Sequence, residues 1–184
     1  MTEKRFQENA EHRQQGNAMT TKRLTRDALL TALALIIFLV EAQIPAPIPI
    51  PGVKLGLANI VTLWALFLSG PADALLILLC RVLLGSFFAG QLASLFYSLS
   101  GGLLCFLLTL FLRRFVTKSQ IWVCGVFGAV AHNAGQIGTA ILLTGTPSLL
   151  IYFPVLVVSG VITGLFTGLC AQFLIHYFQR LGLP

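Results

Sequence analysis

One arginine lies in the middle of an apolar run that has no other charge after its first residue. Arg81 falls near the centre of the run from Asp73 to Gly90. On insertion-based scales a central arginine costs about 2.5–3.5 kcal/mol, whereas each Leu, Ile, Phe or Val returns only about 0.3–0.6 kcal/mol. A planar guanidinium suits a carboxylate or a phosphate. Arg81 is therefore expected to face a partner, a cavity or an anionic ligand inside a membrane protein.

Other polar side chains are expected at a similar depth. Counting 1.5 Å per residue from the outer end of each apolar run places His132, the deepest of them, about 16 Å below that end. His132 and Gln136 are i, i+4 on one run, and Asn133 and Gln136 are i, i+3, so this trio is expected to share a helix face. The predicted ligand-binding group, taken from four helices and the outer mouth, is Arg81, Asn59, His132, Asn133, Gln136, Lys54 and Glu41.

Two alternatives stay open for this polar group. The amides and the imidazole would otherwise be interhelical hydrogen-bond partners worth about 0.6 kcal/mol each. Glu41 is the acid that Arg81 can reach on the outer side, so the pair would otherwise form an internal ion pair. The two roles of Arg81 can also alternate, with Glu41 holding Arg81 when the site is empty and yielding it to a ligand.

The elements that position these residues are expected to be apolar helices. The chain has 184 residues, of which 57% are hydrophobic and 10% charged, and this composition excludes a soluble domain with a polar shell. At about 20 residues per span, six transmembrane helices fit in one bundle. Hydropathy, with Gly, Pro and charges as boundaries, places them at residues 24–42, 53–68, 72–89, 92–112, 121–143 and 149–178.

The distribution of basic residues predicts the orientation of the bundle. With the N-terminus in the cytoplasm, the inner side holds Lys4, Arg5, Arg13, Lys22, Arg23, Arg26, Arg113, Arg114, Lys118 and Arg180. This asymmetry predicts a multi-pass protein of the cell membrane with both termini cytoplasmic. It also accounts for the net charge of +6, so a nucleic-acid partner is not indicated. Residues 1–20 are expected to be a polar, disordered tail, and residues 21–184 the membrane domain.

Small residues predict how the helices pack. Gly160, Gly164 and Gly168 repeat at i+4 and allow close backbone approach, which favours a tight contact inside the bundle over a dimer face. The four cysteines lie in apolar segments without a Cys-x-x-Cys pair, so they are interpreted as packing residues with no metal site.

A proline-rich segment joins the first two expected spans. Residues 44–52 alternate proline with apolar residues, which favours a stiff, extended rod of roughly 20 Å. This outer loop is expected to cover the polar group as a lid with a hinge at Gly52, the alternative being a simple spacer.

The segment after this loop carries a family resemblance. The run Pro51-Gly-Val-Lys-Leu-Gly-Leu-Ala-Asn-Ile-Val61 follows the proline-rich loop and a helix ending in Glu41. This pattern resembles the small membrane proteins called the Gx transporter family, also labelled heptaprenyl diphosphate synthase component I, over about residues 20–180. That family is similar to the substrate-binding S components of energy-coupling factor transporters. The resemblance implies an outward ligand pocket capped by the loop, and docking of Ala28 and Ala32 on a coupling membrane subunit.

The residues themselves give no support to catalysis of prenyl transfer. Prenyl diphosphate synthases resemble one another in aspartate-rich motifs, and the aspartates of this chain are Asp27 and Asp73, far apart in sequence. The sequence has no Gly-rich phosphate loop followed by Lys and Ser or Thr, so it is not expected to hydrolyse ATP. We therefore expect no enzyme activity of the chain alone, no cofactor and no metal.

Three functions follow as hypotheses. The first is a substrate-binding transport protein that captures a small anionic molecule from the outer side and delivers it inward with a coupling membrane subunit and ATPases. The second is a non-catalytic accessory subunit in isoprenoid or quinone synthesis, working with a prenyl synthase catalytic subunit. The third is a membrane enzyme that uses His132, which predicts turnover by the purified protein and a bell-shaped pH profile.

Overall fold

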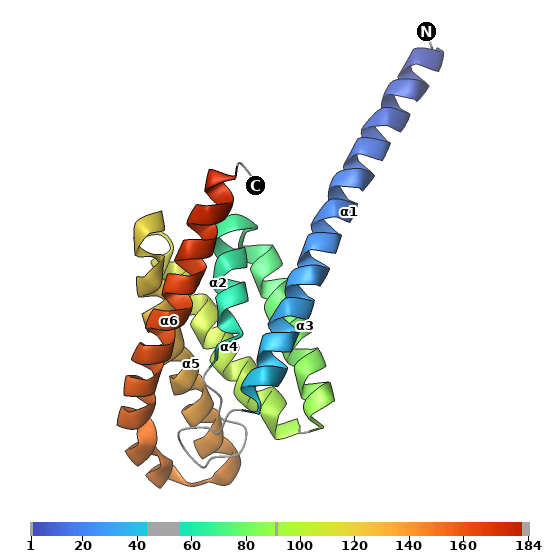
Figure 1. The fold of residues 1–184 in the computed structure, drawn as a ribbon. Helices are drawn as coiled ribbons and strands as arrows, with labels where there is room; N and C mark the ends of the chain where they lie inside the picture. The colour runs from blue at the N-terminus through green and yellow to red at the C-terminus, as the bar shows by residue number, and fades with distance from the viewer. Residues whose placement is uncertain (1, 44–55, 91, 182–184) are drawn as a thin grey trace.

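The computed structural model describes residues 2–43, 56–90 and 92–181, and these residues are almost entirely helical. The long elements are α1 (Thr2–Glu41), α2 (Asn59–Leu68), α3 (Pro71–Ala89), α4 (Leu92–Leu112), α5 (Ile121–Thr144) and α6 (Phe153–Arg180). Two short 3-10 helices, η1 (Lys118–Gln120) and η2 (Pro147–Tyr152), precede α5 and α6. Each expected span thus overlaps one of these α-helices. Figure 1 shows the helices side by side in one bundle.

Among the described residues, four segments are long and apolar enough to cross a membrane. They are Pro71–Phe88, Ala93–Leu112, Lys118–Thr144 and Pro147–Arg180. The ten-residue α2 is apolar but shorter. The exposed surface is rich in large apolar side chains such as Phe87, Leu142 and Ile151, which are 77–85% exposed. The chain is therefore an all-helical protein of membrane type.

The first helix is longer than expected. Residues 2–20, which the sequence predicts to be a disordered tail, continue α1 and extend beyond the other helices (Figure 1). The segment is rich in Glu, Gln, Arg and Lys, which have good helix propensity, so the backbone can follow the helix that begins in the bundle. Within the bundle α1 packs against α3 and ends at Glu41. We call the end of the bundle near Asp73 the Asp73 end, and the opposite end the Glu41 end.

The second helix begins later than expected. The predicted span at 53–68 becomes a helix only at Asn59, because residues 56–58 form a turn. Gly56 has a φ of +81°, a left-handed conformation that glycine adopts readily. The proline-rich residues 44–52 and Lys54, predicted to be a lid and a ligand contact, lie outside the described residues.

Glycines bring α5 into close contact with α6 and α4. A Cβ added to Gly164 would lie 2.6 Å from the carbonyl oxygen of Gly125, and one added to Gly168 would lie 2.6 Å from Trp122 Cα. Where α5 meets α4, a Cβ on Gly135 would lie 2.8 Å from Gly101 Cα. The predicted tight contact of Gly160, Gly164 and Gly168 within the bundle is confirmed.

The last expected span is divided in two. The sequence predicts one long segment at 149–178, whereas the structure has η2 followed by α6. Pro154 lies in the first turn of α6, where its missing N–H group breaks no helical hydrogen bond. The proline therefore marks the start of α6 and does not kink the helix.

Candidate functional site

Four polar side chains from three helices form one connected chain in the interior. Arg81 Nη2 on α3 donates to Asn59 Oδ1, the first residue of α2, at 2.7 Å. Asn59 Nδ2 lies 3.3 Å from His132 Nδ1 on α5, and His132 Nε2 lies 3.0 Å from Gln136 Nε2. All four side chains are at most 9% exposed. The structure therefore brings together four of the residues predicted to form the ligand-binding group.

Arg81 is buried without a carboxylate partner among the described residues. Its side chain is 2% exposed, and its bond to Asn59 is the hydrogen bond it makes within the described part of the chain. Its Nε is buried and has no hydrogen-bond partner there. The described carboxylates include none within 4.0 Å of the guanidinium. The buried guanidinium therefore keeps an unsatisfied donor within the described part of the chain.

Glu41 takes a position that the sequence did not indicate. The ion pair between Glu41 and Arg81, one of the two alternatives for Arg81, is absent among the described contacts. Instead the Glu41 carboxylate accepts a hydrogen bond from the backbone N–H of Gly56 and faces the N–H groups of Leu57 and Ala58. A turn that points successive N–H groups to one place attracts a carboxylate strongly. The charge of Arg81 acts on Glu41 from a greater distance.

Asn133 is separated from the rest of the group. Its Nδ2 donates to the carbonyl oxygen of Leu156 on α6 at 2.7 Å. The predicted shared face of His132, Asn133 and Gln136 is therefore wrong for Asn133, because neighbouring residues on a helix point about 100° apart and α6 lies on that other side. In this position Asn133 links α5 to α6.

The His132 ring is held on both sides. Asn59 contacts Nδ1 and Gln136 contacts Nε2, and a Cβ on Gly101 would lie 2.9 Å from the ring. Both ring nitrogens are thus engaged by amide side chains within the closed interior. This arrangement gives His132 a structural part in the polar chain, and it offers no free ring nitrogen to a reacting group.

Sequence reasoning missed a row of polar residues on α4. Ser94, Tyr97 and Ser98 are 1–5% exposed, and the Ser94 hydroxyl has no partner among the described residues. One turn further along, Gly101 faces His132. The spacing i, i+3, i+4, i+7 was the available signal, since it places all of these residues on one helix face. Serines inside an apolar run are common enough that this signal is weak without the neighbouring helices.

The space beside Asn59 is small. A cavity of ≈ 20 Å³ is lined by Gly56, Asn59, Thr62, Leu63, Cys105, Thr109, Cys124, Gly125, Ala129 and Thr167. This volume holds about one water molecule. The cavity by itself is therefore too small for an organic ligand.

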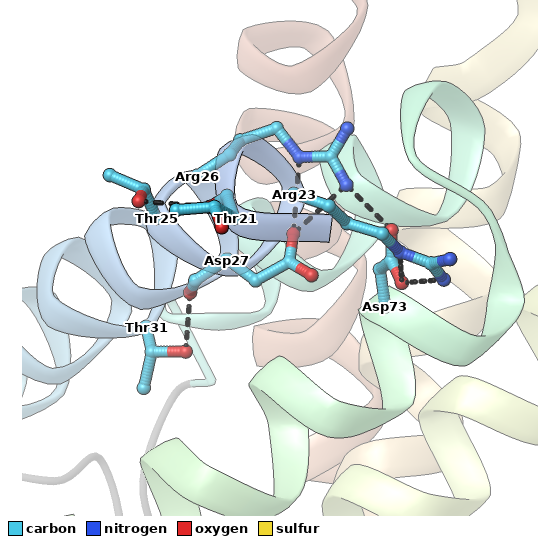
Figure 2. A network of polar contacts seen from close by, with 7 residues as sticks. All are labelled: Thr21, Arg23, Thr25, Arg26, Asp27, Thr31 and Asp73. Carbon is cyan, nitrogen blue, oxygen red and sulfur yellow. Dashed lines mark hydrogen bonds and ion pairs between the residues drawn. The ribbon is translucent and has the colours of Figure 1, made fainter. Parts of the chain in front are cut away.

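A second polar cluster lies at the Asp73 end and joins α1 to α3 (Figure 2). Arg23 Nε donates to Asp73 Oδ1 at 2.8 Å, and Arg26 Nη2 donates to Asp73 Oδ2 at 2.6 Å. Arg26 also donates to Asp27 at 3.0 Å. Both aspartates are 4% exposed, whereas the two arginine side chains are 40–58% exposed. The hydrogen bond from Arg23 to Asp73 and the charge of Asp73 raise the pKa of Arg23 above its usual value.

The comparison with known families decides the relationship of this chain. A family model described as heptaprenyl diphosphate synthase component I matches residues 30–174. The chain belongs to this family. The comparison with curated proteins and the comparison with solved structures found no match.

The synthase component I family model covers the interior site. Glu41, Asn59, Arg81, His132 and Gln136 all fall within the matched residues. The family description names one component of a synthase, in agreement with the expectation that the chain is not by itself the enzyme. The arginines and Asp27 of the second cluster lie before residue 30, outside the match.

Proposed function

We propose that this chain is a non-catalytic membrane subunit that binds an anionic ligand through Arg81 and acts together with a prenyl synthase catalytic subunit. The observation that carries the proposal is the buried guanidinium without a carboxylate within 4.0 Å in the described part of the chain. An unpaired charge in a low-dielectric interior is costly, and such a residue in a membrane protein marks a functional site. A bound anion supplies the missing partner.

The free groups of Arg81 set the kind of ligand. Asn59 accepts from one Nη2 donor, and Nε has no hydrogen-bond partner among the residues that the structure describes. A guanidinium edge of this kind binds phosphate or carboxylate oxygens, and bidentate pairs are among the stronger charge-assisted hydrogen bonds. The family description names a diphosphate product, so a prenyl diphosphate is the ligand class that we favour. Its hydrocarbon chain is compatible with the exposed apolar surface of the helices and with the bilayer.

The proposal includes the orientation of the bundle. We place the Asp73 end at the cytoplasmic face and the Glu41 end at the outer face, with six helices spanning the membrane and both termini inside. The basic residues on the connections near the Asp73 end support this orientation through the positive-inside rule. The roles of Lys54 as a second cation and of residues 44–52 as a cover remain part of the same proposal.

A second function is favoured by one surface of α1. Ala28 and Ala32 are exposed one helical turn apart, beside the exposed Leu29, Leu33 and Ile36. Small residues at i, i+4 allow another helix to approach closely. This face supports docking of a coupling membrane subunit, in a protein that captures an anion from the outer side and delivers it inward with ATPases.

Substitution of Arg81 tests anion binding directly. Farnesyl diphosphate and inorganic pyrophosphate are titrated against the full chain in lipid nanodiscs. We expect Arg81→Gln to weaken binding about 10- to 100-fold, and Arg81→Lys to restore only part of it because an ammonium lacks the bidentate fork. Asn59→Asp offers Arg81 an internal carboxylate, so it is also expected to weaken binding. Unchanged affinity in Arg81→Gln would refute the proposal.

A double substitution on α1 separates the two functions. Ala28→Trp with Ala32→Trp places bulk on the exposed face. Loss of substrate uptake with intact prenyl-product formation would favour the transport function. Loss of prenyl-product formation with intact uptake would favour the accessory subunit. The control is Leu165→Trp, which adds a tryptophan to the exposed face of α6. Ala171→Trp would not serve as a control, because Ala171 is fully buried.

A further inference from the structure

The turn before α2 forms a concave arrangement of backbone N–H groups. Gly56 has a φ of +81°, and Ala58 has right-handed helical angles with φ −63° and ψ −13°. Asn59 N donates to Gly56 O at 3.0 Å, which closes the turn. The backbone N–H groups of Gly56, Leu57 and Ala58 all face the Glu41 carboxylate, so the turn presents an anion-binding concavity at the N-terminal end of α2. The following helix adds the positive end of its dipole.

The Glu41 carboxylate occupies this concavity. It accepts a hydrogen bond from Gly56 N and faces the N–H groups of Leu57 and Ala58, and the side chain is 4% exposed. This concavity, which we call the anion seat, is therefore filled by a side chain of the protein itself. The carboxylate comes from the end of α1, which is separate in sequence from the turn that holds it.

Arg81 is an independent sign that this region is built for an anion. Its Nε is buried and unpartnered among the described residues, and its other end is bonded to Asn59, the residue directly after the turn. Glu41 and Arg81 attract each other electrostatically without forming an ion pair within 4.0 Å. The Glu41 carboxylate thus contacts the turn directly, while Arg81 acts on it only through its charge.

We propose that Glu41 is an internal occupant of an anion seat formed by the N–H groups of Gly56, Leu57 and Ala58, and that the anionic group of a ligand binds by displacing it. This inference rests on the proposed anion-binding function and adds the mode of competition. The incoming group carries phosphate or carboxylate oxygens, which satisfy the same N–H donors and also reach the free edge of Arg81.

Neutralising Glu41 tests the competition. Glu41→Gln keeps the size of the side chain and removes the charge that competes for the seat. If Glu41 fills the seat most of the time, its removal raises the apparent affinity for inorganic pyrophosphate by about tenfold, because the fraction of protein with an open seat rises. Glu41→Asp shortens the side chain and is expected to give a smaller gain. Asp27→Asn at the other end is the matched control for net charge and is expected to leave the affinity unchanged.

Several results would contradict the inference. Calorimetric titration of each full-length variant in nanodiscs, with thermal unfolding as the check of folding, gives the affinities. Equal or weaker pyrophosphate affinity in both Glu41→Gln and Glu41→Asp overturns the competition. If Arg81→Gln still weakens pyrophosphate binding in that case, the proposed anion-binding function holds and only the displacement of Glu41 is refuted. A parallel titration with succinate distinguishes the two ligand sources: a gain in Glu41→Gln for succinate alone assigns the seat to carboxylates, and a gain for pyrophosphate assigns it to phosphates.

Discussion

Asn59 Oδ1 accepts a hydrogen bond from Arg81 Nη2 at 2.7 Å, while Asn59 Nδ2 faces His132 Nδ1 at 3.3 Å. A guanidinium can only donate, so Arg81 fixes the orientation of the amide and thereby directs its nitrogen to the imidazole. The first residue of α2 thus connects α3 to α5. The turn before the same helix is joined to α1 by the contact of Glu41 with Gly56.

Replacement of Asn59 by leucine is expected to destabilise the protein. Arg81 would lose its hydrogen-bond acceptor in the interior, at a cost of about 1–3 kcal/mol in the free energy of unfolding. Thr62→Val on the next turn of α2 is the matched control, since the Thr62 hydroxyl is buried without a partner among the described residues. We expect that variant to be at least as stable as the wild type, because it removes a buried hydroxyl that has no partner there. Denaturant titration in detergent micelles measures both; equal losses would contradict the importance of the Asn59 contact.

Gly56→Ala is expected to disturb the turn and the polar chain together. A φ of +81° strains any residue with a Cβ, and this Cβ would lie 3.0 Å from Asn59 Nδ2 and 3.1 Å from His132 Cδ2. We expect a loss of about 2–3 kcal/mol, of which roughly 1–2 kcal/mol is backbone strain.

Gly145→Ala is the control for that experiment. Gly145 has a similar φ of +63°, but a Cβ there meets no atom within 4 Å. It should therefore show the backbone strain alone, about 1–2 kcal/mol. If the two alanine variants unfold at the same midpoint, the approach of the added methyl group at residue 56 to Asn59 and His132 does not contribute to the loss of stability.

Gly164→Ala is expected to separate α5 from α6. The new methyl group would lie 2.6 Å from the carbonyl oxygen of Gly125 and 2.7 Å from Val126 Cα, and backbone atoms cannot move aside cheaply. Overpacking of this kind costs about 1–3 kcal/mol. Gly138→Ala in α5 has no atom within 4 Å of its Cβ and should stabilise the helix by about 0.5–1 kcal/mol. Thermal unfolding in micelles checks whether the two variants change in opposite directions, as this packing requires.

Asp73→Asn is expected to loosen α1 at the Asp73 end. The buried carboxylate accepts hydrogen bonds from Arg23 and Arg26 on another helix, and hydrogen bonds to charged groups contribute about 1.5–3 kcal/mol. Asp27→Asn removes a carboxylate whose arginine bonds come from the adjacent residue, so a smaller effect is expected. Hydrogen exchange along α1 is the suitable measurement. Faster exchange in Asp27→Asn than in Asp73→Asn would argue against the link between α1 and α3.

Much of the helical architecture was accessible from the sequence. The apolar run around Arg81 predicts a helix from 72 to 89, and the structure has α3 at Pro71–Ala89. The glycines at 160, 164 and 168 predict the close contact that α6 makes inside the bundle. These predictions succeed because apolar length and small-residue spacing act locally, within one helix. The depth of Asn59, Arg81, His132 and Gln136 follows from the same counting, since a helix rises by a fixed amount per residue.

The partners of these residues depended on the tertiary structure. Sequence counting puts Glu41 near Arg81. In the structure the Glu41 carboxylate instead accepts a hydrogen bond from the backbone of the left-handed turn at Gly56. Counting also groups Asn133 with His132, whereas the position of α6 gives Asn133 the carbonyl of Leu156. Depth along a helix is a property of the sequence, because the rise per residue is constant. Which side chains meet at that depth depends on how helices are rotated and spaced, and those rotations are set by packing across the whole bundle.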